Sequence, residues 1–335
     1  MSESIKSDSL DAVILCNRYL KGQLSVITEV LPAGSQIAMV DEPVHRNIGD
    51  HLIHLGTTQF LRDHNIQTVV RANTYSYHRS WFAKCVNPET IIVCHGGGHF
   101  GDLYPAHQRL REKVAKDFPS NRIVTLPQSI YFKDPIEAHR AALALRQHPD
   151  YHLFVRDRDS LRKAEALQLP NLYLAPDMAH ALSPYPGQNG QVRKGANRTL
   201  CLLRRDNEQE GKVEIEACKK QVDWADLVKT SDTLLLGLLS VAFRVCRRLG
   251  PVPGGHRLLD RERGKLVRRA ERLFADHDQV ITSRLHGMIF SILLGKPVTV
   301  LPSLTGKTEA YIASWLTVPE CKRMLNTHSE HETGR

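Results

Sequence analysis

Four short motifs place polar side chains at the ends of predicted strands, and the most informative is ITSRLHG, residues 281–287. Arg284 and His286 lie there between a β-branched run and the apolar stretch MIFSILLGKP. A guanidinium can hold the oxygens of a phosphate or carboxylate, and an imidazole can donate or accept a proton near neutral pH. A lone histidine is usually structural, but its pairing with an arginine at a strand-to-helix junction favours an anion site with an acid–base group.

The other three motifs each allow a structural interpretation beside the functional one. NIGD, residues 47–50, opens a predicted helix that Asp50 could cap. HGGGHFGD, residues 95–102, follows an apolar strand, and its glycines allow either the close approach of a ligand or a tight turn. Asp102 at its end could be a general base or a helix cap. VRDRDS, residues 155–160, carries two arginines that suit either local salt bridges or an anion.

Several classes of site are not indicated by the sequence. The patterns GxxxxGK[ST] and GxSxG do not occur, so neither a P-loop nor a nucleophile elbow is predicted. His95 and His99 have the spacing of a helical metal pair, but glycines separate them, so no metal site is expected. The seven cysteines are scattered and form no CxxC pair, and reduced thiols are the simpler interpretation.

β-branched runs alternate with amphipathic stretches of helical length along the chain. Strands are predicted at residues 36–41, 67–70, 90–94, 122–126, 152–155, 172–175, 199–203, 279–282 and 298–301. Helices are predicted at residues 50–64, 106–118, 135–147, 160–167, 231–249, 257–275, 285–294 and 308–316. This alternation is typical of βαβ units and parallel sheets, in which functional groups collect at the carboxyl ends of the strands.

One break in the alternation divides the chain. Residues 183–195 (SPYPGQNGQVRKG) combine proline, glycine and polar side chains, as linkers do. At 335 residues the chain is also long for a single core. We therefore expect an α/β protein with mostly parallel sheets and two Rossmann-like domains, residues 1–190 and 191–325, with an interdomain cleft and a tail at residues 326–335.

In this order the four motifs resemble the polysaccharide pyruvyl transferase family. PQS at residues 127–129, PD at 176–177 and LLRR at 202–205, each at a predicted strand end, agree with that family as well. The resemblance covers residues 36–302, and SRLH followed by an apolar helix and GKPV is its most specific part. It implies two Rossmann-like domains in a GT-B-like arrangement. The implied reaction transfers pyruvate from phosphoenolpyruvate onto two hydroxyls of one sugar, giving a cyclic ketal and phosphate.

The resemblance also implies roles for single residues. Phosphoenolpyruvate would be bound or activated by Arg156, Ser160, Arg204, Arg284 and His286. The acceptor or the glycine loop would involve Asn47, Asp50, Gly97, Gly98 and Ser129. His286 is then the general acid and Asp102 the base, or these two roles are exchanged. No cofactor and no metal is expected. Because Arg158 follows Arg156 and Arg205 follows Arg204, which arginine of each pair faces the cleft stays open.

The charge of the chain is concentrated in one segment. The chain has 45 Lys and Arg against 36 Asp and Glu, a formal net charge of +9. Residues 244–272 contain ten basic and three acidic side chains and so account for +7 of that excess. This segment is either the solvated side of a helix or a surface attracted to anionic lipid or to a lipid-linked sugar acceptor.

The apolar run at residues 234–243 reaches only about half of the roughly 20 residues that span a bilayer, so it predicts a buried helix. The N-terminus lacks the layout of a signal peptide. We therefore expect a cytoplasmic protein, with a peripheral contact at the inner face of the membrane as the functional alternative for the basic segment.

Two other functions remain compatible with the sequence. A GT-B glycosyltransferase that uses a nucleotide sugar would share the expected fold. A nucleic-acid-binding protein would use the basic segment, but no reader module is recognisable and few aromatic side chains accompany the basic ones. Nucleic acid is therefore not expected as a partner, and the acceptor sugar and the oligomeric state are not predicted.

Overall fold

The computed structural model describes residues 2–185, 198–205, 220–303 and 305–325. Its strands form two sheets, of seven and four strands. The larger has the order β2-β1-β3-β5-β6-β7, with β4 beside β5, and the smaller the order β11-β10-β8-β9. The described pairings are parallel in both sheets. The α/β class with parallel sheets is therefore confirmed.

The larger sheet consists of β1 (Gln36–Val40), β2 (Gln67–Arg71), β3 (Ile91–Cys94), β4 (Gly97–Gly101), β5 (Ile123–Tyr131), β6 (Tyr151–Val155) and β7 (Leu172–Leu174). The smaller consists of β8 (Thr199–Leu202), β9 (Gln221–Val222), β10 (Gln279–Thr282) and β11 (Val298–Val300). The predicted strands match these positions closely. Residues 279–282 lie between two stretches with helical apolar patterns, so the sequence predicted the position of β10.

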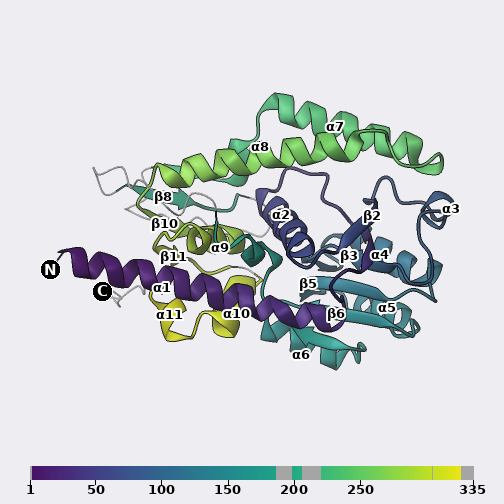
Figure 1. Cartoon of the computed structure of the whole chain (residues 1–335), viewed down its shortest axis with the longest axis horizontal. Coiled ribbons are helices and arrows are strands. Elements are labelled where there is room, and N and C mark those ends of the chain that lie inside the picture. Colours follow the sequence, from purple (N-terminus) through teal and green to yellow (C-terminus); the bar gives the residue numbers. More distant parts are fainter. Residues whose placement is uncertain (1, 186–197, 206–219, 304, 326–335) are drawn as a thin grey trace.

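The α-helices are α1 (Ser2–Gln23), α2 (Ile48–Asp63), α3 (Arg79–Phe82), α4 (Pro105–Asp117), α5 (Pro135–Arg146), α6 (Arg158–Ala166), α7 (Thr230–Val245), α8 (Gly255–Ala275), α9 (Leu285–Leu293), α10 (Lys307–Trp315) and α11 (Pro319–Lys322). Short 3₁₀ helices are η1 (Leu24–Glu29), η2 (Met178–Leu182), η3 (Trp224–Leu227) and η4 (Cys246–Arg248). The two sheets lie side by side with α2 between them, and α7 and α8 run together along one edge (Figure 1).

Both faces of the larger sheet are buried, as helices on both sides of a parallel sheet require. Alternate residues of β1 belong to different cores: Ala38 and Val40 to one, Ile37 and Met39 to the other. Successive side chains of a strand point to opposite faces, so both residue sets must be apolar. This explains why the strands of this sheet read as continuous apolar runs.

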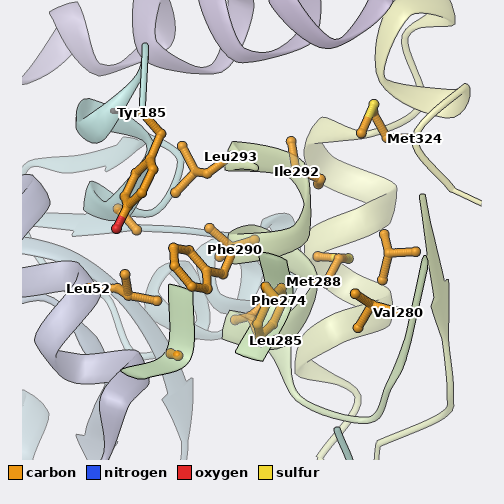
Figure 2. Packing of buried hydrophobic residues seen from close by; sticks show 14 of the residues in the cluster. Leu52, Tyr185, Phe274, Val280, Leu285, Met288, Phe290, Ile292, Leu293 and Met324 are labelled. Atoms are coloured by element: carbon orange, nitrogen blue, oxygen red, sulfur yellow. The ribbon is translucent and has the colours of Figure 1, made fainter. Parts of the chain in front are cut away.

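A third core surrounds the smaller sheet and includes Phe274 of α8 and Phe290 of α9, whose ring centroids lie 5.0 Å apart. Leu52 of α2 packs into the same core, near Phe290 in Figure 2. The next residue of α2, Ile53, is buried in a core of the larger sheet. α2 therefore packs against both sheets and fixes their separation.

α1 belongs to the core of the smaller sheet although it comes first in the chain. Val13, Cys16 and Leu20 are buried there, and Cys16 forms a disulfide with Cys321 of α11. The interpretation of seven reduced thiols is therefore wrong at this pair, because no spacing pattern relates two cysteines 305 residues apart. The predicted linker lies largely at residues 186–197, and the tail at 326–335, both outside the described residues, so the domain boundary stays a prediction.

The glycine-rich segment is a strand rather than the predicted loop. Gly97–Gly101 form β4, which pairs with β5. Gly101 has φ +138°, and a Cβ there would lie 1.7 Å from the carbonyl oxygen of Tyr131, so only glycine fits against β5. Residues 96–101 match the letters GxGxxG, but they do not form the turn into a helix on which dinucleotide binding depends.

α7 contains the apolar run that was predicted to be a buried helix, and this prediction is wrong. Leu236, Leu239 and Phe243 are buried, but the opposite side of the helix is exposed, with Leu234 at 63% and Leu238 at 60%. An apolar run longer than one helical stripe covers both sides of the helix, so its inner side alone can reach the core. Among the described helices, none combines the length and apolar character needed to cross a bilayer.

α8 is fixed to the larger sheet by ion pairs around the buried carboxylate of Glu42. Arg71 of β2 and Arg263 of α8 both contact its Oε1, and His256 Nδ1 lies 2.6 Å from Oε2. Asp260 of α8 pairs with the same two arginines. Burial would raise the pKa of Glu42, but His256, Arg263 and Arg71 hold it well below its usual value. Part of the basic segment is therefore neutralised inside the fold.

Candidate active site

A pocket of about 570 Å³ lies between the two sheets, and the segments that line it follow strand ends. From the larger sheet come residues 45–47 and 50 after β1, 98–99 in β4, 104 and 107 near the start of α4, and 156 after β6. From the smaller sheet come residues 204–205 after β8, 223–226 and 228 around β9, 284–286 after β10, and 303, 307 and 308 after β11. These segments lie at the sheet ends where functional groups of parallel α/β sheets usually collect.

His286, Asp177 and Arg156 are linked inside this pocket. His286 Nε2 lies 3.3 Å from Asp177 Oδ2, and the same oxygen accepts a 2.8 Å hydrogen bond from Arg156 Nη1. Burial would raise the pKa of Asp177, but the charges of His286 and Arg156 hold it well below its usual value. The carboxylate is therefore ionised, and it lies within ion-pair distance of the His286 ring.

Backbone conformation places these side chains. Arg284 is the N-cap of α9, so His286 lies in the first turn of that helix. The ring packs directly on Gly49 of α2, where a Cβ would lie 2.5 Å from His286 Nδ1. Asp177 is the N-cap of η2, and its amide donates to the buried hydroxyl of Tyr311 on α10. The dyad of His286 and Asp177 therefore joins elements of both sheets.

Cationic groups surround the dyad. Gly98 provides room for Arg156 and Lys307, since a Cβ there would lie 3.2 Å from Arg156 Nη2 and 3.6 Å from Lys307 Nζ. Arg284 lines the pocket and is held by Asp223, with Nη2 2.7 Å from Oδ2. Arg204 lines it too. These groups form a positively charged half of the pocket that suits a small, multiply charged anion.

The other half contains histidines and carboxylates. Asn47 caps α2 and donates a 2.8 Å hydrogen bond to Asp50 Oδ2. His45 Nε2 lies 3.4 Å and His99 Nε2 3.5 Å from the Asp50 carboxylate. Burial would raise the pKa of Asp50, but the charge of His99, with His45 and His286, holds it well below its usual value. Asp50 is therefore an anion that lines the same pocket as the arginines.

His107 adds a second histidine–carboxylate pair to this half. Its Nδ1 lies 2.6 Å from Oδ1 of the buried Asp41, and its ring stacks on that of His99 with centroids 4.6 Å apart. Burial lowers the pKa of His107, but the charge of Asp41 more than offsets this, so the pKa is raised. His107 therefore titrates closer to neutral pH than a buried imidazole would alone.

The structure brings seven of the predicted residues into the pocket: Asn47, Asp50, Gly98, Arg156, Arg204, Arg284 and His286. Ser129 and Ser160 lie behind it. Ser129 Oγ accepts a 2.9 Å hydrogen bond from Arg156 Nε and donates to Asp157, and Ser160 Oγ accepts from the Ile130 amide. Both serines therefore hold the strand ends in place rather than contact a ligand.

Asp102 and Gly97 are also not among the described residues that line the pocket. The Asp102 carboxylate accepts hydrogen bonds of 2.8 and 2.9 Å from the amide of Lys133 and 2.8 Å from that of Asp134. It therefore holds the loop before α5. It does not cap α4, the helix that follows it in the chain, where the structural interpretation placed it; the N-cap of α4 is Tyr104. Gly97, with φ +134°, lies in β4, where a Cβ would meet the ring of His99 at 2.9 Å.

The sequence analysis assigned no role to Asp177, His107 or Lys307. Asp177 belongs to the motif PD, which follows β7 at the same sheet edge as Arg156. This place after a strand is a sequence signal that could have indicated a site residue. Lys307 follows β11 in the same way, at the start of α10. His107 lies within α4 in a stretch with no distinctive pattern, and only the tertiary structure shows it beside Asp41.

Comparison with known proteins shows to which family the chain belongs. The family model of polysaccharide pyruvyl transferases matches residues 47–303. The chain belongs to the polysaccharide pyruvyl transferase family. It is therefore a transferase, and the resemblance of the four motifs is confirmed.

Individual members of the family align over most of the chain. EpsO of Bacillus subtilis, which carries a pyruvyl transferase name, is 34% identical over 315 residues, 93% of this chain and 95% of its own. Pyruvyl transferase 1 of Schizosaccharomyces pombe is 31% identical over 294 residues, 84% of this chain and 70% of its own. The family fold is thus shared by proteins of bacteria and a yeast.

A solved structure supports the fold. The crystal structure of an uncharacterized protein from Klebsiella pneumoniae superposes with a TM-score of 0.56 and covers 88% of this chain and 92% of that one. At 17% identity this similarity concerns the arrangement of helices and strands only.

Proposed function

We propose that this transferase moves pyruvate from phosphoenolpyruvate onto two hydroxyls of one sugar in a polysaccharide or its lipid-linked precursor, forming a cyclic ketal and releasing phosphate. The observation that carries the proposal is the contact of His286 with Asp177 in a pocket that also contains Arg156, Arg284 and Lys307. This contact supports the proposal of a proton donor beside groups that can bind anions. The two sheets are proposed to act as the two lobes of a GT-B-like arrangement.

The arginine half of the pocket is proposed to bind the donor. Phosphoenolpyruvate carries a carboxylate and a phosphate, so two fixed cationic groups at different positions fit it better than one. Arg156 is preset by Ser129 and Asp177, and Arg284 is preset by Asp223. Both guanidinium groups are thus already oriented before an anion arrives, which lowers the entropic cost of binding.

His286 is proposed to donate a proton to C3 of phosphoenolpyruvate, which becomes the methyl group and leaves C2 electron-deficient. The oxygen of one acceptor hydroxyl then bonds to C2 and loses its proton. The second hydroxyl oxygen bonds to C2 as the bond from C2 to the phosphate oxygen breaks, and phosphate leaves with the electron pair. Two C–O bonds and one C–H bond form, while one C–O bond and the C2–C3 π bond break. The proton of the first hydroxyl passes through the base to the departing phosphate, and that of the second restores the acid. Such acid–base catalysis contributes typically about 10² to 10⁴-fold in rate.

The histidine half is proposed to receive the acceptor, and His107 with Asp41 is proposed as the base in place of Asp102. His107 lines the pocket, whereas the carboxylate of Asp102 is occupied by the amides of Lys133 and Asp134. The raised pKa of His107 suits a group that accepts a proton near neutral pH.

The exposed side of α7 is proposed to contact an anionic membrane at its surface. Leu234, Leu238, Val241 and Val245 recur at helical spacing and are each more than half exposed. Arg248, exposed just beyond the end of the helix, adds positive charge beside them. Apolar side chains with basic neighbours on one helix side are typical of interfacial binding, and this contact would bring the pocket to a lipid-linked acceptor.

The reaction is tested by incubating the protein with phosphoenolpyruvate and candidate glycans, then measuring released phosphate and a pyruvyl addition by mass spectrometry. Both signals should require the acceptor and should fall strongly in Arg284→Ala. The exposed Arg162 of α6, changed to Ala, is the matched control and should leave both signals intact.

Two other outcomes would contradict the proposed reaction. Thermal stabilisation by a nucleoside diphosphate, without stabilisation by phosphoenolpyruvate, would favour a nucleotide-sugar glycosyltransferase. Salt-dependent retention on DNA, with no phosphate release on any acceptor, would favour nucleic-acid binding through the basic segment.

A further inference from the structure

The histidine half of the pocket contains a group of side chains that the proposed reaction does not fully use. His99 is only 6% exposed, and within the described part of the chain neither of its ring nitrogens makes a hydrogen bond. A buried polar group without a partner costs free energy, so it usually serves a ligand. The ring faces the pocket, beside the carboxylate of Asp50.

From this arrangement we infer that His45, Asp50 and His99 form a binding site for a divalent transition-metal ion. The ligand atoms would be Nε2 of both histidines and the carboxylate of Asp50, and the three atoms lie within 4.8 Å of one another. Two imidazoles and one carboxylate form a donor set that suits ions such as Zn²⁺, Mn²⁺ or Co²⁺.

Each histidine lies from the Asp50 carboxylate at a distance typical of two ligands of one ion. Two ligands held tetrahedrally about 2.1 Å from a zinc ion lie about 3.4 Å apart. His45 Nε2 lies 3.4 Å from Asp50 Oδ2, and His99 Nε2 lies 3.5 Å from Asp50 Oδ1, so the two contacts involve different oxygens. The carboxylate would therefore hold the ion through both oxygens. The contact of 3.3 Å from the Asn47 amide to His45 Nδ1 would open, because coordination through Nε2 moves the ring proton to Nδ1.

Neighbouring groups would support the ion from outside. Asn47 donates to Asp50 Oδ2 and thereby orients the carboxylate. The Gln128 side chain accepts a hydrogen bond from the backbone amide of His99, which fixes the segment that carries the ring. His107 stacks on His99 while its Nδ1 is bonded to Asp41. Such outer contacts orient metal ligands, and changing them typically lowers metal affinity by about 10 to 100-fold.

The carboxylates of this half also suit a cation. Asp41 and Asp50 are both buried, and each carboxylate lies within ion-pair distance of a histidine ring. Arg111 Nη2 lies 3.6 Å from Asp41 and offsets part of that charge, whereas the Asp50 carboxylate would be a ligand of the ion.

A role for the ion rests on the proposed function, whereas its binding does not. A bound ion would coordinate an acceptor hydroxyl and lower its pKa, which would make the oxygen a better nucleophile. The arginine half of the pocket stays available for the donor, because the metal ligands come from the loop after β1, the first turn of α2 and β4.

The test is metal binding by the full chain in the absence of any substrate. After dialysis against a chelator, the protein is titrated with Co²⁺, Zn²⁺ and Mn²⁺, and binding is followed by calorimetry and by the visible absorption of bound Co²⁺. We expect one ion per chain and a rise in thermal stability with ion concentration. Asp50→Asn and His99→Ala should each weaken binding by more than about 10-fold.

The exposed His139 of α5, changed to Ala, is the matched control and should bind as the wild type does. Circular dichroism and melting curves of the metal-free variants report whether each is folded, and His45→Gln provides a third ligand variant. Absence of saturable binding to the wild type would overturn the inference. So would unchanged affinity in folded Asp50→Asn and His45→Gln. Failure of the pyruvyl transfer assay would leave these binding results unaffected, so the two proposals fail separately.

Discussion

His286 Nε2 lies 3.3 Å from Oδ2 of Asp177, although 109 residues separate the two in the chain. Asp177 comes after β7, the last strand of the larger sheet, and His286 comes after β10 of the smaller sheet. Neither sheet alone can therefore assemble the acid that the proposed reaction needs. The dyad also explains why a strand-end aspartate and the SRLH motif occur together in this chain.

Replacing His286 by Ala should lower the rate of phosphoenolpyruvate-dependent phosphate release by about 10² to 10⁴-fold, because the proton donor is lost. Binding of phosphoenolpyruvate should change much less, since the arginines remain. Rates with saturating donor and donor affinity from thermal shift separate the two effects. A His286→Ala variant that retains near-normal turnover would exclude His286 as the acid.

Gly49→Ala should impair catalysis with little effect on stability. The added methyl would lie 2.5 Å from His286 Nδ1, so the ring must shift from the position in which it contacts Asp177. A displacement of about 1 Å can cost on the order of 10²-fold in rate. Gly237→Ala on α7 is the control, because a Cβ there meets nothing within 4 Å. Equal activity of the two variants would show that the position of the ring is unimportant.

Asp177→Asn should lower the free energy of unfolding by about 3 to 5 kcal/mol at neutral pH, because it leaves the buried Arg156 without its counterion. The pKa of Asp177 in the folded chain lies below its usual value of 3.8. The contribution of the ionised Asp177 to the free energy of unfolding is therefore complete above pH 3.8 and is lost as the pH falls below that value.

Urea unfolding of wild type and variant at a series of pH values measures this difference directly. The gap in stability should be widest near neutrality and should narrow below pH 3.8. A gap that is constant across this range would mean that the charge of Asp177 is not what stabilises the fold.

The double change of Leu238→Glu and Val245→Glu should reduce binding to vesicles rich in anionic lipid, since it removes apolar area from the exposed side of α7. Wild-type binding should weaken in high salt, because each basic residue near such a surface contributes about 1 kcal/mol. Ile136→Glu on α5 is the control, since that side chain is also exposed, at 76%. Pyruvyl transfer to a water-soluble acceptor should be unchanged in all three proteins.

The wild-type protein could instead fail to bind vesicles and form a dimer that the double change disrupts. That result would show that the exposed side of α7 binds a second copy of the chain. Size-exclusion chromatography with light scattering distinguishes this outcome from lipid binding.

The sequence predicted the parallel sheets well because the strands of the larger sheet are buried on both faces and therefore read as unbroken apolar runs. It also predicted the positions of Arg156, Arg284 and His286, since each follows such a run directly. Local pattern is sufficient wherever a side chain's role depends on its place at a strand end.

Other features depend on contacts between distant segments, which periodicity does not record. Gly97–Gly101 form a strand because they lie close against β5. α7 lies at the surface because only one of its sides packs against the core. His107 acquires its role from Asp41, which lies at the end of β1, and the sequence gives no reason to connect the two. Asp102 was interpreted as a general base or as a cap of the helix that follows it, but its carboxylate instead accepts hydrogen bonds from two amides of the loop before α5, 31 and 32 residues further along the chain.

The ion pairs around Glu42 limit which residues of α8 can be substituted during evolution. Arg263 pairs with Glu42 and Asp260 pairs with Arg71, so a substitution at either one removes an ion pair that joins α8 to the larger sheet. Arg257, Arg261, Arg268 and Arg272 point to solvent on the same helix. Mutational drift should therefore be tolerated at these four positions and resisted at the other two, even though none of the six lines the pocket.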